Sequence, residues 1–181
     1  MSTVLTEMMD SRDLNSDNIS RIISLSRDIN SDHYKTQVLK KVIRENDMPK
    51  DAFDAFIATL GDVNSDHYVT EVIKDLIDRS VDSNTSGLSN LLNLVKDNVA
   101  SDHYSAVIFK RLAKKNLSDD QLITALNATS NINSDHYMSE VLLAFASKVN
   151  RSSDRVKSAY RSAAKSINSD SYYGKVAKAV D

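Results

Sequence analysis

One pentapeptide recurs along the whole chain and constrains the fold more than any other feature. It is built around Ser-Asp-His-Tyr, and its aspartates are Asp32, Asp66, Asp102, Asp135 and Asp170. The steps between them are 34, 36, 33 and 35 residues. A near-constant step of this size is typical of solenoids that stack pairs of helices, in which each repeat is one two-helix unit.

The copies differ little from one another. The first residue of the pentapeptide is asparagine except at Ala100, and the last copy has Ser171 where the other four have histidine. The repeat motif consists of Ser31, Asp32 and Tyr34; Ser65, Asp66 and Tyr68; Ser101, Asp102 and Tyr104; Ser134, Asp135 and Tyr137; and Ser169, Asp170 and Tyr172.

The residues after each copy predict an amphipathic helix, the second helix of the repeat. Apolar side chains follow at spacings of four, one, three and one, which place them on one stripe of an α-helix. These residues are Tyr34, Val38, Leu39, Val42 and Ile43; Tyr68, Val72, Ile73, Leu76 and Ile77; Tyr104, Ile108, Phe109, Leu112 and Ala113; and Tyr137, Val141, Leu142, Phe145 and Ala146.

The other half of each repeat predicts a first helix, with starts near Ser16, Pro49, Asn84, Ser118 and Ser153. Residues of these types cap helices or occupy the first turn. Its apolar residues are Ile19, Ile22 and Ile23; Phe53, Phe56, Ile57 and Leu60; Leu88, Leu91, Leu92 and Val95; Leu122, Ile123 and Leu126; and Val156, Tyr160, Ala163 and Ala164.

The sequence therefore predicts an all-α fold, an α-α superhelix of about five two-helix repeats in a single array over residues 1–181. The expected units are 1–14 (partial), 15–48, 49–82, 83–117, 118–151 and 152–181. With only three glycines and one proline, the composition also favours long helices over sheets.

Several function classes find no support in the residues. The net charge of −2 lacks the basic excess of nucleic-acid binders, and no apolar run is long enough to span a membrane. There is no cysteine, no glycine-rich phosphate loop and no His-Glu-x-x-His pair. We therefore expect no enzyme activity, no cofactor and no metal.

The motif residues have a structural interpretation. The serine is expected to cap the second helix, and the aspartate to place its charge at the positive end of the helix dipole. The tyrosine lies on the apolar stripe, so we expect its ring to be buried between the two helices of the repeat and its hydroxyl to reach a polar partner at the edge.

The histidines are harder to explain structurally. All four, His33, His67, His103 and His136, take the same motif position and face away from the core stripe. Stacked helices lie about 8–10 Å apart, so these rings are expected to form a ladder along one edge. Three interpretations remain open: a bond to the neighbouring repeat's loop or aspartate, contact with a ligand, or a metal shared between rungs.

Lysines recur on the same helices. Lys40, Lys74 and Lys110 occupy equivalent positions and, with the histidines, define a candidate ligand-binding face. Such a face is either solvated or a repeated groove for an acidic or extended partner.

The two ends of the array predict a segment of a longer protein. Val4, Leu5 and Met8 align with the second helix at an offset of 34, whereas the motif that should precede them is missing. If so, apolar residues such as these and Val180 are expected to be exposed and to allow end-to-end self-association.

The stretch from Ile29 to Leu39, Ile-Asn-Ser-Asp-His-Tyr-Lys-Thr-Gln-Val-Leu, resembles a bacterial HEAT-like helical repeat that reads roughly Ile-x-Ser-Asp-Tyr/Phe followed by Val-Leu. That repeat occurs in envelope-associated proteins, including extracytoplasmic parts of antirepressor-type membrane metallopeptidases related to β-lactam sensors. The extra histidine places the tyrosine one residue later here. The zinc motif of the metallopeptidases is absent, so the resemblance implies a sensing or interaction module of the bacterial periplasm or envelope and no activity.

From the sequence we expect a non-enzymatic scaffold that binds a protein or peptide. The alternatives are a surface built on the histidine ladder that senses a ligand, metal or carbohydrate, and a purely structural spacer.

Overall fold

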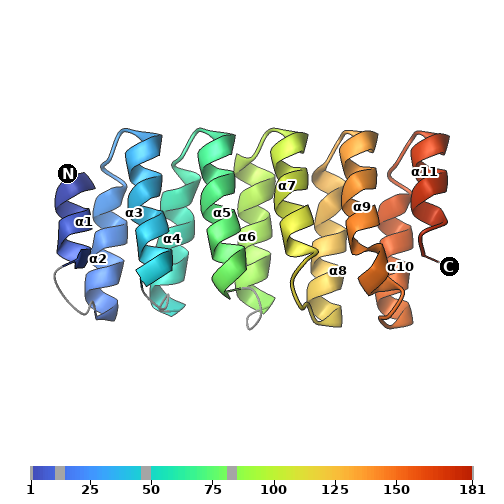
Figure 1. The fold of residues 1–181 in the computed structure, drawn as a ribbon, viewed down its shortest axis with the longest axis horizontal. Coiled ribbons are helices and arrows are strands. Elements are labelled where there is room, and N and C mark those ends of the chain that lie inside the picture. The colour runs from blue at the N-terminus through green and yellow to red at the C-terminus, as the bar shows by residue number, and fades with distance from the viewer. Residues whose placement is uncertain (1, 11–14, 46–49, 81–84, 181) are drawn as a thin grey trace. The chain divides into compact units, whose positions relative to one another are not determined.

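The chain forms helices joined by short loops. The computed structural model describes residues 2–10, 15–45, 50–80 and 85–180, and within these ranges it contains 11 α-helices and no strand (Figure 1). The helices are α1 (Ser2–Asp10), α2 (Ser16–Ser26), α3 (Asp32–Glu45), α4 (Lys50–Gly61), α5 (Asp66–Ser80), α6 (Thr85–Asn98), α7 (Asp102–Leu112), α8 (Asp119–Ala128), α9 (Asp135–Val149), α10 (Asp154–Ala164) and α11 (Asp170–Ala177). A short 3₁₀ turn, η2 (Thr129–Asn131), follows α8. The all-α prediction is confirmed.

Each copy of the motif opens a helix, as the sequence predicts. Helices α3, α5, α7, α9 and α11 all begin at the motif aspartate. The helices between them have more varied starts. The Asn15 side chain, rather than Ser16, caps α2 by accepting a bond from the Asn18 amide at 2.9 Å. Ser118 and Gln121 form a reciprocal capping box on α8, whereas the predicted starts at Pro49 and Asn84 lie outside the described residues.

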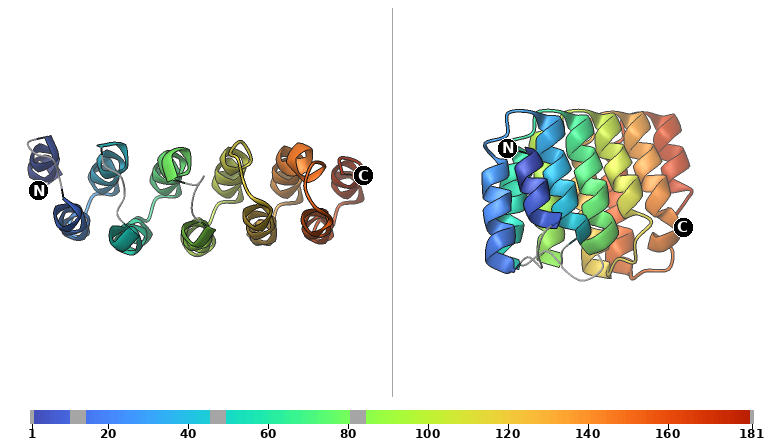
Figure 2. Two further views of the ribbon diagram at one scale, coloured as in Figure 1. Left: turned by 90° about the horizontal axis from the view of Figure 1, so that it is seen from below. Right: turned by 60° about the vertical axis from the view of Figure 1, so that its left-hand side comes forward.

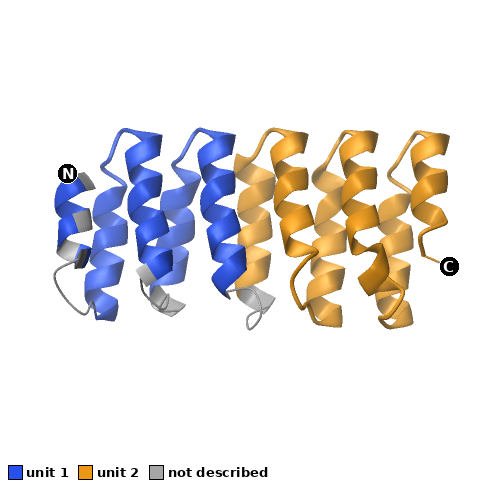
Figure 3. Ribbon diagram, viewed as in Figure 1, with its two compact units in different colours: residues 1–79 blue, residues 80–181 orange. Residues whose placement is uncertain are grey.

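The chain divides into two compact units, Met1–Arg79 and Ser80–Asp181 (Figure 3). In unit 1, α1 packs against α3 and α2 packs against α4, while ion pairs join α3 to α5. The helices of this unit therefore form two layers, one of α1, α3 and α5 and the other of α2 and α4 (Figure 2).

Unit 2 repeats this arrangement internally. Helix α8 packs against α6 and α10 in one layer, and α9 packs against α7 and α11 in the other (Figure 2). Contacts of α10 with α9 and α11 join the two layers. Within each unit, the contacts between neighbouring helices fit a helical repeat.

The core lies between the layers and agrees closely with the predicted stripes. The four residues after the tyrosine in each predicted stripe are buried in every copy, from Val38 (0% exposed) to Ala146 (7%). In the first-helix layer, Phe53, Ile57 and Ile123 are exceptions, since they are only half-buried. The loop residue before each motif is also buried, which the sequence patterning did not predict; these residues are Ile29, Val63, Val99, Ile132 and Ile167.

The prediction that the motif tyrosines are core residues is wrong. Tyr34 is 55% exposed, and its four equivalents are half-buried. The reason is angular: at about 100° per residue, the stripe from Val38 to Ile43 centres about 70° past Val38. On this wheel, Tyr34 falls about 110° from the centre and Lys35 only about 10° from it. Lys35 is accordingly 5% exposed and donates from its ammonium group to the Asp62 carbonyl.

The predicted exposure of apolar residues at the chain ends is only partly correct. Val4 is 57% exposed, but Leu5 and Val180 are each 3% exposed and belong to the core. The side chain of Met8 lies outside the described residues. Within the described ranges, no helix combines the length and apolar character needed to cross a membrane.

Candidate functional site

The motif aspartates bind the loop of the following repeat. In unit 1, Oδ2 of Asp32 accepts bonds from the backbone amides of Asn64 at 3.1 Å and Ser65 at 3.0 Å. These amides precede α5, so they have no carbonyl partner within a helix. The aspartate therefore stabilises the next repeat as well as lying in the first turn of its own helix.

The same staple occurs twice in unit 2. The carboxylate of Asp102 accepts from Asn133 and Ser134 at 3.1 and 2.8 Å. That of Asp135 accepts from the Asn168 and Ser169 amides at 3.1 and 2.8 Å. Bonds to an ionised acceptor are among the strong ones in proteins. The staple explains why aspartate recurs at this position.

The motif serines of unit 2 occupy the N-cap position without capping their helices through their side chains. Ser101, Ser134 and Ser169 adopt extended N-cap backbone geometry, but none makes a side-chain bond to the first turn. In the first copy, Oγ of Ser31 lies 3.5 Å from the Tyr34 amide, a long contact. The predicted serine cap is therefore wrong for the three copies in unit 2.

Histidine and tyrosine rings alternate along one edge of unit 1. The ring of His33 lies 5.2 Å from that of Tyr34 in its own repeat and 5.6 Å from that of Tyr68 in the next, both in edge-to-face geometry. His67 continues the series at 5.3 Å from Tyr68. These four rings are called the unit 1 ladder.

Unit 2 has a longer ladder of five rings. His103 lies 5.3 Å from Tyr104 and 5.6 Å from Tyr137, and His136 lies 5.1 Å from Tyr137 and 5.8 Å from Tyr172. The Tyr172 hydroxyl is also 3.4 Å from Nδ1 of His136. These rings, from Tyr104 to Tyr172, are called the unit 2 ladder; at its end, the Lys175 ammonium lies 5.4 Å from the centre of the Tyr172 ring.

The ladders give the histidines a neighbour that the sequence did not predict. Instead of a bond to the neighbouring loop or aspartate, the rings of His33 and His103 contact the tyrosine ring of the next repeat. Edge-to-face pairs at these distances contribute about 0.5–1.5 kcal/mol each beyond burial. All four histidines are nevertheless exposed.

The ladder geometry weighs against a metal shared between rungs. In the contact series, one tyrosine ring stands between successive imidazoles, whereas zinc ligands converge to about 2 Å from one ion. In the part of the chain that the structure describes, no three histidine or acidic side chains are placed to hold a metal ion together.

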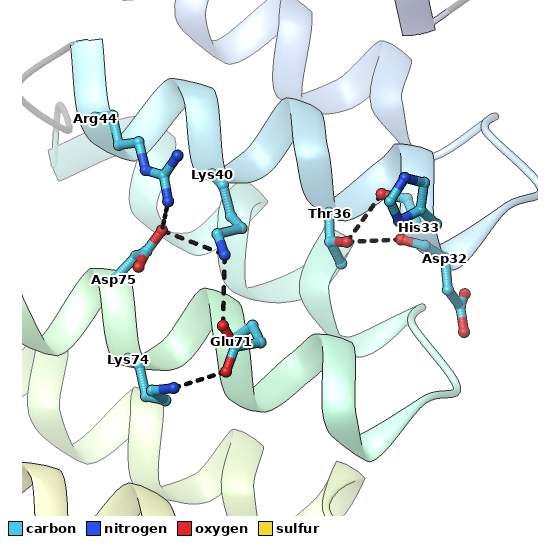
Figure 4. A network of polar contacts seen from close by, with 8 residues as sticks. All are labelled: Asp32, His33, Thr36, Lys40, Arg44, Glu71, Lys74 and Asp75. Carbon is cyan, nitrogen blue, oxygen red and sulfur yellow. Dashed lines mark hydrogen bonds and ion pairs between the residues drawn. The ribbon is translucent and has the colours of Figure 1, made fainter.

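The candidate lysines are ion-paired. Nζ of Lys40 lies 3.7 Å from carboxylate oxygens of both Glu71 and Asp75 on α5, and Arg44 joins Asp75 at 3.0 Å. Lys74 pairs with Glu71 at 2.7 Å within its own helix (Figure 4). The hydrogen bond from Lys74, together with the charges of Lys74 and Lys40, lowers the pKa of Glu71 against partial desolvation.

The equivalent position in unit 2 behaves in the same way. Lys110 on α7 pairs with Glu140 on α9 at 2.8 Å, and Nε2 of His136 lies 3.7 Å from the same carboxylate. The hydrogen bond from Lys110 lowers the pKa of Glu140 below its ordinary 4.5. The three candidate lysines thus join neighbouring helices or stabilise their own helix. Of the candidate ligand-binding residues, the histidines of the ladders are the exposed ones.

The Ser, Asp and His of one copy do not form a catalytic arrangement. Asp102 uses both carboxylate oxygens on the amides of the next loop, and the His103 ring contacts Tyr104 and Tyr137. A nucleophile needs a base within hydrogen-bond reach that is itself oriented by a third group.

One further depression lies at the α10–α11 end of unit 2. It has a volume of about 570 Å³ and is lined by Ser158, Tyr160, Arg161, Ser162, Ala164, Lys165, Tyr173, Ala177 and Val180. Tyr160 is buried there and donates from its hydroxyl to the Val176 carbonyl at 3.2 Å. Burial raises the pKa of Tyr160 to about 12.

Comparisons of the chain with models of protein families, with curated proteins and with solved structures found no match.

Proposed function

We propose that this protein is a non-enzymatic repeat scaffold, a HEAT-like α-α superhelix, that binds a protein or peptide along its His–Tyr ladders. The observation that carries the proposal is the alternation of exposed imidazole rings with phenol rings that are exposed in Tyr34 and half-buried in the other copies, at the same edge of successive repeats. The core and the staple account for the apolar and aspartate positions, but neither requires an imidazole.

The physical properties of the ladder suit a binding surface. Tyrosine presents a large, amphipathic contact area at low cost in side-chain entropy, and it is enriched where proteins contact one another. The inner rings of each ladder are held on both sides by their neighbours, as Tyr137 is by His103 and His136. Rings that are already ordered lose less freedom when a partner docks, which raises affinity.

Two features narrow the kind of partner. The lysines Lys40, Lys74 and Lys110 are each paired with a carboxylate, which weakens their attraction for an acidic partner. The resemblance of the motif to envelope-associated helical repeats supports a sensor or interaction module in a larger bacterial protein.

Aromatic rings also stack on sugars, so carbohydrate binding at the same ladder is the second candidate function.

A selection experiment tests the proposal. A random peptide library is displayed and selected on the folded chain, and the recovered peptides are measured against a His103→Ala/His136→Ala variant. The control is Tyr173→Ser, because Tyr173 is an exposed tyrosine that is not one of the ladder rings. Helix content by circular dichroism confirms that all three proteins fold.

We expect the recovered peptides to bind the double variant at least about tenfold more weakly, a loss of about 1.4 kcal/mol, and the control equally well. Failure to recover binders, or recovery of binders that ignore the double substitution, would refute ladder docking.

A further inference from the structure

We propose that the partner of the ladder is a segment in the polyproline II conformation that presents a proline or other apolar side chain at every third residue. This inference rests on the proposed function above and names its partner class. It follows from the spacing of the rings, from the hydrogen-bonding groups at the edge and from its charge.

The spacing of the ladder matches one regular backbone conformation. Successive repeats are joined by two ring steps, of 5.6 and 5.1 Å from His103 to His136, and packed helices lie about 8–10 Å apart. A polyproline II chain returns to the same face after three residues, a rise of about 9 Å. Side chains on one face of a β-strand recur about every 7 Å, and the turns of an α-helix about every 5.4 Å. Of these three conformations, only polyproline II repeats at the spacing of packed helices, so only it places one side chain opposite each consecutive repeat.

The hydrogen-bonding groups of the edge complement such a chain. The carboxylates of Asp102 and Asp135 are already occupied by the amides of the next loop. Both nitrogens of His136 already have polar neighbours, the Tyr172 hydroxyl and the Glu140 carboxylate. Among the described residues, the Tyr137 hydroxyl and the His103 imidazole make ring contacts but no hydrogen bond, and these two groups supply donors. A proline-rich segment has no amide hydrogens to satisfy, and its carbonyls have no partner within the chain, so it offers acceptors alone.

The charge of the ladder agrees with a neutral partner. Glu140, the carboxylate nearest to His136, is paired with Lys110 at 2.8 Å, so the centre of the unit 2 ladder carries no unpaired acidic group among the described side chains. Aromatic-lined surfaces bind proline-rich segments in part because these chains are already extended and lose little entropy on docking.

The unit 2 ladder sets the length of the segment. This ladder extends over three successive repeats, from Tyr104 through Tyr137 to Tyr172. Two helix-to-helix spacings of a packed layer amount to about 20 Å. At about 3.1 Å per residue this distance corresponds to six or seven residues, so a peptide of about nine covers it.

The test uses the full chain and a fluorescein-labelled nonaproline peptide, with binding followed by fluorescence anisotropy. A Gly-Ser peptide of equal length controls for the label, and a linear β-linked hexasaccharide, unlabelled and followed by calorimetry, represents the carbohydrate class. The peptide and the sugar are measured on the wild type, on His103→Ala/His136→Ala and on Tyr173→Ser.

We expect nonaproline to bind the wild type with a Kd below about 1 mM and the double variant at least about tenfold more weakly. Binding to Tyr173→Ser should equal the wild type, and the Gly-Ser peptide should not bind. Absence of nonaproline binding, or equal binding to the double variant, overturns the proposed partner class.

The outcomes separate this inference from the function on which it rests. If library-selected peptides depend on the ladder but nonaproline does not bind, the partner class is wrong and the peptide scaffold stands. If only the hexasaccharide binds in a ladder-dependent way, both are overturned in favour of carbohydrate binding.

Discussion

Removing one aspartate staple should destabilise unit 2 by an amount that a matched control isolates. In Asp135→Ala, the amides of Asn168 and Ser169 lose acceptors at 3.1 and 2.8 Å. A bond to a charged acceptor contributes about 1.5–3 kcal/mol when buried, but water can replace the one at the exposed Asn168 amide. We therefore expect a loss of about 2 kcal/mol, most of it from the part-buried Ser169 amide.

The control is Asp170→Ala. Asp170 has the same position in the first turn of α11 and is exposed, and no hydrogen bond of its side chain is present among the described residues. Both substitutions remove a charge from a helix N-terminus, worth about 0.3–1 kcal/mol, so their difference measures the staple. Urea unfolding monitored by circular dichroism gives the free energies, and amide hydrogen exchange in α11 locates the loss. Equal destabilisation by the two substitutions would refute the staple.

Three further predictions concern single side chains. Burial raises the pKa of Tyr160 to about 12, so its contribution to the free energy of unfolding is complete below pH 10.0 and is lost as pH rises towards 12. In urea unfolding at alkaline pH, the free energy of unfolding of Tyr160→Phe should therefore fall by about 1.4 kcal/mol less per pH unit than that of the wild type across this window. The hydrogen bond from Lys110 lowers the pKa of Glu140, so the contribution of this pair to the free energy of unfolding is present above pH 4.5 and lost as pH falls below it. Glu140→Gln should therefore reduce the acid-induced loss of stability in urea unfolding by under about 1 kcal/mol, since the pair is exposed. Thr70→Val should leave the stability unchanged or raise it, because the buried Thr70 hydroxyl has no partner among the described groups. Thr36→Val should lower the free energy of unfolding by about 1 kcal/mol, because the Thr36 hydroxyl donates to a backbone carbonyl. Equal thermal midpoints for the two variants would contradict this reasoning.

The helices and the core could be predicted from the sequence because a regular period leaves few alternatives. Four apolar positions recur in each copy, as Val38, Leu39, Val42 and Ile43 do in the first, and only one face of a helix contains them all. The error at Tyr34 came from including an aromatic residue in the stripe because of its type. Its angle on the helical wheel, about 110° from the centre of the stripe, was available in the sequence and gives the observed exposure.

The contacts between repeats could be predicted only in part. The sequence placed the histidines at one edge, but the ring that each contacts belongs to a residue about 35 positions later, as His136 and Tyr172 show. Which side chain meets which across two stacked helices depends on their offset along the axis, and a repeat period does not give that offset. The pairing of Lys110 with Glu140 was missed for the same reason.

The motif therefore combines two physical tasks in adjacent residues. Asp135 holds the next loop through its carboxylate, whereas the rings of His136 and Tyr137 contact rings of neighbouring repeats. Because these residues open the same helix, the staple that fixes the spacing of the repeats also fixes the spacing of the rings. A surface of this kind presents a constant stride to its partner, and any loss of the staple should weaken ladder binding even though the ladder residues are unchanged.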